Sequence, residues 1–113
     1  SNFNDNECKK NARHEILINL DDIMKVAKKI LKNNGLLAIV HRTDRFMDII
    51  ELMKKYNIEP KKVRFVYPKV NKESNIVLIE GRKNGNPGLK IMSPLYVHMD
   101  NGEYNDEIKN MFQ

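Results

Sequence analysis

Two short clusters of charged and titratable side chains are the strongest candidates for chemistry in this sequence. Arg13, His14 and Glu15 place a base, a titratable ring and an acid side by side, and His41 and Arg42 follow a short apolar run. The carboxyl ends of strands in an open α/β sheet form the rim at which such folds bind ligands. From position alone, His41 and Arg42 fit a ligand-binding rim and a plain strand-to-helix turn equally well.

Other residue types give weaker signals. The three histidines lie far apart, and no spacing brings two of them to one helix face or hairpin, so we expect no metal site. The glycines between residues 81 and 88 match neither a dinucleotide-binding fingerprint nor a phosphate-binding loop. Lys69 and Lys72 can contact phosphate, but lysines on any solvated surface look the same.

The composition describes one small globular domain. The chain has 113 residues, 41% hydrophobic and 31% charged, with a net charge of +5. Its longest apolar run, residues 36–40, is far shorter than the roughly 20 residues that a bilayer requires, so we expect no membrane partner. Cys8 is the single cysteine, and no secretory leader is visible, which favours a reducing, cytoplasmic location. The basic balance permits a polyanionic partner such as RNA.

Periodicity and turn residues predict the elements that position these clusters. We expect an N-terminal loop over residues 1–15, then a helix that Asn19 caps and that ends with Gly35 in the left-handed conformation. The unbroken apolar run at 36–40 is typical of a strand covered on both faces. A second helix follows Thr43 and ends at Asn57, with buried positions at Phe46, Ile49, Ile50 and Met53.

The remainder predicts two more strands, at residues 63–67 and 75–80, and a loop at 81–88. Residues 89–99 are extended, and residues 105–112 form a short helix. A strand, a helix and a strand make a parallel pair, and the next strand returns antiparallel. The fold class is therefore α/β, with an α/β half-domain at 16–82 and a C-terminal tail at 83–113 that packs on it.

Several stretches together resemble one family. They are Ala-Arg-His-Glu at 12–15, Val-His-Arg at 40–42, Phe-Val-Tyr-Pro-Lys at 65–69, and Glu-Ser-Asn at 73–75 running into Val-Leu-Ile-Glu at 77–80. In order and spacing they resemble the C-terminal half of a bacterial tRNA adenine N6-methyltransferase, which modifies an anticodon-loop adenine of a valine tRNA. Residues 89–104 are similar to the tail of that family.

The resemblance implies a fold, an activity and a cofactor. It implies the C-terminal half of a Rossmann-like class I methyltransferase, with a mixed three-stranded sheet whose last strand is antiparallel and central, and two helices on one face. The parent protein would use S-adenosylmethionine. The Gly-rich cofactor loop and the Asn-Pro-Pro-Tyr type motif of the family are absent here, so we expect this chain alone to bind no cofactor and to be inactive.

The resemblance also implies a supporting role in binding tRNA. Its candidate substrate-binding residues are Arg13, His14, Glu15, His41, Arg42, Lys69 and Lys72. Half a sheet leaves the strand at 36–40 with an unpaired edge, so we expect a homo-oligomer through that edge, or pairing with the N-terminal loop. Two alternatives stay open, namely a small basic module that binds RNA or protein without catalysis, and a subunit that completes its sheet with another chain.

Overall fold

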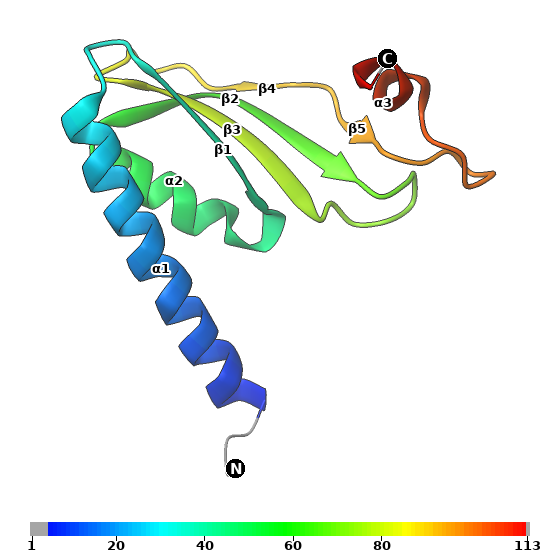
Figure 1. The fold of residues 1–113 in the computed structure, drawn as a ribbon, viewed down its shortest axis with the longest axis horizontal. Helices are drawn as coiled ribbons and strands as arrows, with labels where there is room; N and C mark the ends of the chain where they lie inside the picture. Colours follow the sequence, from blue (N-terminus) through cyan, green and yellow to red (C-terminus); the bar gives the residue numbers. More distant parts are fainter. Residues whose placement is uncertain (1–4, 113) are drawn as a thin grey trace.

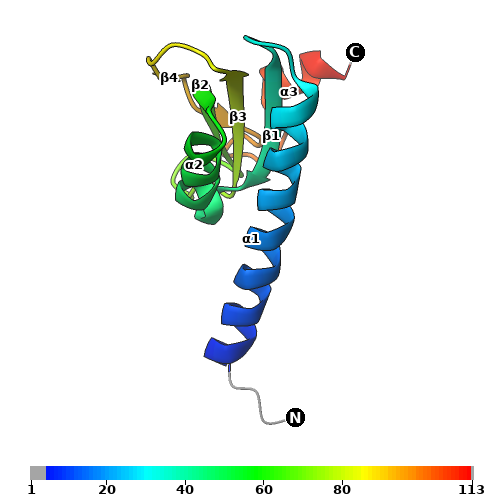
Figure 2. The ribbon, with the colours of Figure 1, turned by 90° about the vertical axis from the view of Figure 1, so that its left-hand side faces the viewer.

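A mixed β-sheet carries two helices on one of its faces in the computed structural model, which describes residues 5–112 (Figure 1). In chain order the main elements are α1 (Asp5–Ile30), β1 (Leu36–Arg42), a 3₁₀ turn η1 (Thr43–Arg45), α2 (Phe46–Lys55), β2 (Ile58–Tyr67) and β3 (Ile76–Lys83). Figure 2 shows α1 and α2 on the same side of these strands. The expected α/β class with two helices on one face is confirmed.

The third strand lies between the first two. β3 pairs antiparallel with β1, where Val40 faces Leu78, and antiparallel with β2, where Arg64 faces the same leucine. The strand order is therefore β1-β3-β2, and β1 and β2 run parallel without touching. This confirms the expected antiparallel strand in the centre of the sheet.

One apolar cluster joins the helices to the sheet. Side chains of alternate residues on β2 and β3 point toward the helices, and Val63, Val77 and Ile79 are fully or almost fully buried there. From the helices, Met24 and Met53 pack against them and are also fully buried. Phe46 packs edge-on against Phe65 at a ring separation of 5.2 Å. The expected apolar stripe of α2 is thus confirmed as core.

The first helix begins much earlier than the sequence predicts. Residues 5–15, expected as a loop, form the first turns of α1, and Asn19 lies inside the helix as an exposed residue. The expectation was wrong because Lys9, Ala12, Arg13 and their neighbours have good helix propensity, so the helix needs no start at Asn19. The first four residues of that expected loop lie outside the described residues.

The strand at 36–40 is covered on one face, and the expectation of two covered faces was wrong. Leu37 and Ile39 are half-buried toward the helices, whereas Leu36 and Val40 are exposed on the other face. β1 is also the last strand of the sheet on its side, so its outer edge pairs with no strand among residues 5–112.

Asparagines, rather than glycines, take the left-handed backbone conformation at the turns that follow α1 and α2. Asn34 has φ +65° after α1, where Gly35 was expected to do so, and Asn57 has φ +58° after α2. Asparagine tolerates this region better than most residues. A Cβ on Gly35 would instead lie 2.8 Å from the carbonyl oxygen of Lys32, so close approach explains that glycine.

The sheet is larger than the three short strands that the sequence predicts. β2 begins at Ile58 and includes Pro60, where the pairing shifts register. β3 extends to Lys83, into the first three residues of the loop expected at 81–88. The tail adds β4 (Lys90–Ile91) and β5 (Leu95–Tyr96), both parallel to β2, and ends in α3 (Asp106–Met111). The tail escaped prediction as strands because each segment is only two residues long.

A carboxylate on α1 holds the two helices together. Asp21 accepts a hydrogen bond from the Tyr56 hydroxyl at 2.7 Å, and its oxygens lie 3.2 Å from Lys55 Nζ and 3.1 Å from Lys25 Nζ. The hydrogen bond from Tyr56, followed by those from the lysines, lowers the pKa of Asp21 from 3.8 to about 2. Folding therefore favours the ionised carboxylate.

This arrangement predicts a specific loss of stability in acid. A carboxyl group whose folded pKa is depressed stabilises the fold above its unfolded pKa, and that contribution is lost as the pH falls from about 4 toward 2. Asp21→Asn should lower the Tm at pH 7, and the Tm difference from the wild type should shrink across this window. Asp22→Asn, the adjacent exposed carboxylate, is the matched control and should show little change in Tm at pH 7. A difference for Asp21→Asn that is independent of pH would contradict the assignment.

Candidate functional site

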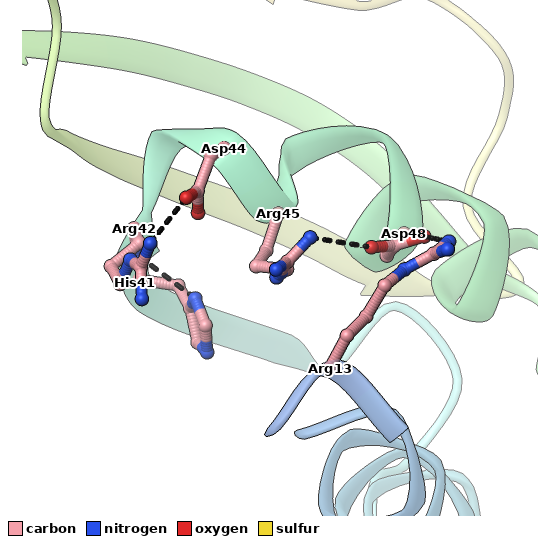
Figure 3. A network of polar contacts seen from close by, with 6 residues as sticks. All are labelled: Arg13, His41, Arg42, Asp44, Arg45 and Asp48. Carbon is pink, nitrogen blue, oxygen red and sulfur yellow. Dashed lines mark hydrogen bonds and ion pairs between the residues drawn. The ribbon is translucent and has the colours of Figure 1, made fainter. Parts of the chain in front are cut away.

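A network of arginines and aspartates surrounds the carboxyl end of β1 (Figure 3). His41 and Arg42 end the strand, Arg45 lies in η1, and Asp48 lies in the first turn of α2. The C-terminal end of α1 leads through a turn into the start of β1. The N-terminal residues of α1 therefore lie near the carboxyl end of β1. Arg13 therefore reaches this network from α1 (Figure 3).

Asp48 is shared by two arginines. Arg13 Nη2 donates to Asp48 Oδ1 at 2.9 Å, and Arg45 Nη1 lies 3.8 Å from Asp48 Oδ2. The carboxylate is only 14% exposed, and its hydrogen bond and negative charge raise the pKa of Arg13. Two guanidinium groups thus share one carboxylate, and the negative charge of Glu51 also contributes to raising the pKa of Arg13.

Arg45 is a candidate that the sequence did not single out. Its Nε atom is buried and finds no hydrogen-bond acceptor within residues 5–112. A buried donor without an acceptor is unfavourable, so this atom marks a polar group that the surrounding fold leaves unsatisfied. The spacing of Arg45 and Asp48, three residues apart as on one helix face, was the available signal.

His41 and Arg42 hold the end of the strand in a defined arrangement. The backbone N–H of Arg42 donates to His41 Nδ1 at 2.8 Å, which places the proton of the neutral ring on Nε2. The Arg42 guanidinium forms an ion pair with Asp44 and is otherwise exposed. The structure is therefore compatible with both interpretations of these residues, as part of a strand-to-helix turn and as part of a ligand-binding rim. They shape the turn, and Arg42 also exposes its charge to solvent.

The three residues at 13–15 do not act as one group. Arg13 is committed to Asp48, while His14 lines a shallow groove between α1 and α2 together with Arg13 and Asp21. Glu15 is exposed on α1 and forms no ion pair within the described part of the chain. Only Arg13 joins the network at the end of β1.

Lys69 and Lys72 lie apart from that network, on the loop between β2 and β3. They line a separate hollow with Pro68, His98 and Gly102. The resemblance placed Arg13, His14 and Glu15 beside the target-base loop and His41 and Arg42 at the rim, with Lys69 and Lys72 as weaker candidates. The structure brings only Arg13 to His41 and Arg42, and it places the two lysines at the end of β2. A role in substrate binding stays a prediction for each of them.

The residues at these strand ends do not suit S-adenosylmethionine. The turn after β1 is filled by η1 and by the pair of Arg42 with Asp44, and neither this turn nor the loop at 68–75 contains glycine. Binding folds of this kind need glycine where the backbone approaches a nucleotide closely. No cluster of three potential metal ligands occurs among residues 5–112, and no helix in that range is long and apolar enough to cross a bilayer.

Comparison with known proteins supports the fold. No protein-family model matches the sequence, and no curated protein matches it. The fold is similar to that of a solved structure, a predicted O-methyltransferase, Atu636, from Agrobacterium tumefaciens, with a TM-score of 0.75 and 16% sequence identity. The similarity covers 81% of this chain and 44% of that one, so the chain spans less than half the length of this relative. The chain thus has the fold of a part of a methyltransferase.

The shared carboxylate predicts an unequal response to two substitutions. Asp48→Asn should lower the Tm by several degrees, because it leaves two guanidinium groups facing each other without a counter-charge. Arg13→Gln should lower the Tm less, because Asp48 keeps Arg45. Thermal unfolding followed by circular dichroism at pH 7 measures both, with Asp44→Asn as an exposed control. An equal or larger loss for Arg13→Gln would show that Arg45 does not share the carboxylate.

Proposed function

We propose that this chain is the C-terminal portion of an S-adenosylmethionine-dependent methyltransferase that acts on an adenine in tRNA. The observation that carries the proposal is the order β1-β3-β2, with the antiparallel strand between two parallel ones. The resemblance to the tRNA methyltransferase family assigns this order to the last three strands of the class I fold. The similarity to part of Atu636 supports the same architecture.

The chemistry of adenine methylation explains why this portion would act in support of another. The exocyclic amine of adenine is a poor nucleophile until a carboxamide and a backbone carbonyl accept hydrogen bonds from its N–H groups. The base must also leave its stack and lie against an aromatic ring. The Asn-Pro-Pro-Tyr type motif that would supply these groups is absent here, and so is a cofactor loop. We propose that the 113-residue chain alone is inactive.

In this proposal the chain contributes positive charge at the rim of the sheet. Arg42 is exposed at the carboxyl end of β1, and the Arg45 side chain beside it is 20% exposed. Arginine binds phosphate well because its planar donors match the phosphate oxygens. These residues would position the RNA backbone and would take no part in methyl transfer itself.

The outer edge of β1 also needs a partner. No strand among residues 5–112 pairs with this edge, and the strand itself carries apolar side chains that are open to solvent on one face, Leu36 at 45% and Val40 at 69% exposed. In a complete methyltransferase a further strand would cover this edge. For the 113-residue chain on its own, we propose that a second copy covers it, because unpaired apolar edges promote association.

The proposed activity is tested with the full-length product of the gene that encodes this sequence. Incubated with S-adenosylmethionine and unmodified bacterial tRNA, it should produce N6-methyladenosine, identified by mass spectrometry of the digested nucleosides. Arg42→Ala should raise the KM for tRNA several-fold with little change in kcat, because it removes a contact with the RNA backbone. Arg82→Ala, an arginine change at the opposite end of β1, is the matched control.

Each alternative result has a distinct meaning. Methylation of a ribose or another oxygen would replace the adenine proposal with an O-methyltransferase, the activity predicted for Atu636. Binding of tRNA without any methyl transfer would favour the small basic binding module. Transfer by the 113-residue chain alone would contradict the proposal that the cofactor and the target base are held elsewhere.

Sedimentation velocity tests the proposed association of the 113-residue chain. The chain should form a dimer or larger species, and Val40→Lys should shift it toward the monomer, because a charge at the edge of a sheet opposes pairing. Met47→Lys, at a residue of α2 that is 64% exposed, is the matched control and should not change the association. A monomer at every concentration tested, or an equal effect of both lysines, would contradict pairing through β1.

A further inference from the structure

We propose that the end of β2 and the C-terminal tail form a binding surface for single-stranded RNA. The surface consists of Lys69, Lys72, His98 and Tyr104 and is called the tail surface below. The lysines would bind phosphate groups, and the stacked rings would support a base. The choice of RNA rests on the proposed function, whereas the affinity for a single-stranded polyanion rests on the contacts that follow.

The tail is fixed directly to the end of β2. The backbone N–H of Val97 donates to the Tyr67 carbonyl at 2.9 Å, and that of His98 donates to the Pro68 carbonyl at 2.9 Å. His98 and Tyr104 then pair across a tight turn at residues 99–103. As a result, a hollow lined by Lys69, Lys72 and His98 forms between the loop and the tail, which lie far apart in the sequence.

Aromatic rings next to this hollow offer a stacking surface. The rings of His98 and Tyr104 are stacked, with centroids 4.7 Å apart and planes inclined by 26°. Tyr104 is still 54% exposed, so much of its ring is open to solvent. Bases stack on exposed aromatic rings with little dependence on sequence, which is how many proteins hold single strands.

The charge of the hollow is not neutralised by the fold. Lys69 and Lys72 are both exposed, and neither forms an ion pair with any residue in the range 5–112. The tail also carries Asp100 and Glu103, and Glu103 lies 3.9 Å from Lys109 Nζ. The two lysines are therefore free to bind phosphate.

The lysines near the C-terminal end of α1 differ only in part, since Lys28 and Lys29 are also exposed and form no ion pair within residues 5–112. There, Lys25 pairs with Asp21, and Lys83 Nζ donates to the carbonyl oxygens of Lys28 and Leu31. These contacts cap the helix and join it to its neighbours, so that region uses part of its positive charge to stabilise the fold. The tail surface does not.

The tail surface is also joined to the network at the end of β1. Thr43, which follows Arg42, has its hydroxyl 2.8 Å from that of Ser74, and its backbone N–H donates to the Asn75 carbonyl at 3.2 Å. Ser74 belongs to the same loop as Lys72. These contacts therefore hold the loop of the tail surface beside the turn that follows Arg42.

Fluorescence anisotropy of a short labelled single-stranded RNA with the 113-residue chain tests the tail surface. The double substitution Lys69→Ala with Lys72→Ala should weaken binding at least five-fold. It should also reduce the slope of log K against log salt by about 1.4, since each phosphate contact to a single strand contributes about 0.7. The matched control is Lys28→Ala with Lys29→Ala, two exposed adjacent lysines on α1.

Substitution of Tyr104 distinguishes the contribution of base stacking to RNA binding from the contribution of charge. Tyr104→Ala should weaken binding roughly five-fold or more without changing the salt slope, and Tyr104→Phe should restore it. Equal effects of the two lysine pairs, or no effect of Tyr104→Ala, would overturn the proposal. Equal binding of single-stranded DNA would support the tail surface and remove the preference for RNA. Binding here without methyl transfer by the full-length protein would contradict the proposed function alone.

Discussion

The hydrogen bonding of β3 along both of its edges is the constraint on which the rest of the structure depends. β1 and β2 do not pair with each other, so β3 alone connects them within the sheet. Its Val77 and Ile79 also form the centre of the core under both helices. Because β3 is antiparallel to its neighbours, the loop before it begins at the carboxyl end of β2 and passes the carboxyl end of β1. One strand direction thus brings Arg42 and the loop with Lys72 to the same end of the sheet.

Much of this architecture was predictable because it rests on local patterns. Apolar periodicity located the buried residues of α2, and an alternation of short apolar runs and turns located the strands. The failures have physical causes. The predicted start of α1 was wrong because the prediction gave more weight to the turn-forming residues near the N-terminus than to the helix propensity of the residues after them, such as Ala12. The prediction that β1 is covered on both faces was wrong, because an apolar run also occurs in a strand with one face that no residue in the range 5–112 covers, as the exposed Val40 shows.

The candidate site was predictable only in part, since its contacts join residues far apart in the sequence. His41 and Arg42 were recognised because the end of a strand is a local feature. The contact of Arg13 with Asp48 spans 35 residues, and the buried Nε of Arg45 depends on how η1 packs. In the same way, Lys69 meets His98 only because the tail returns along β2. The sequence identifies the charged residues, but the three-dimensional path of the chain determines which of them come into contact.

The distribution of charge separates residues that join the helices from the residues proposed to bind RNA. The carboxylates of Asp21 and Asp48 join α1 to α2 and engage Lys25, Lys55, Arg13 and Arg45, so those cations already have partners. The exposed lysines of the loop after β2 carry part of the net charge of +5, and they form no ion pair within residues 5–112. A polyanion that bound the helix cations would compete with the contacts that hold α1 in place. A polyanion at the loop breaks none of these contacts, so binding there leaves the fold undisturbed.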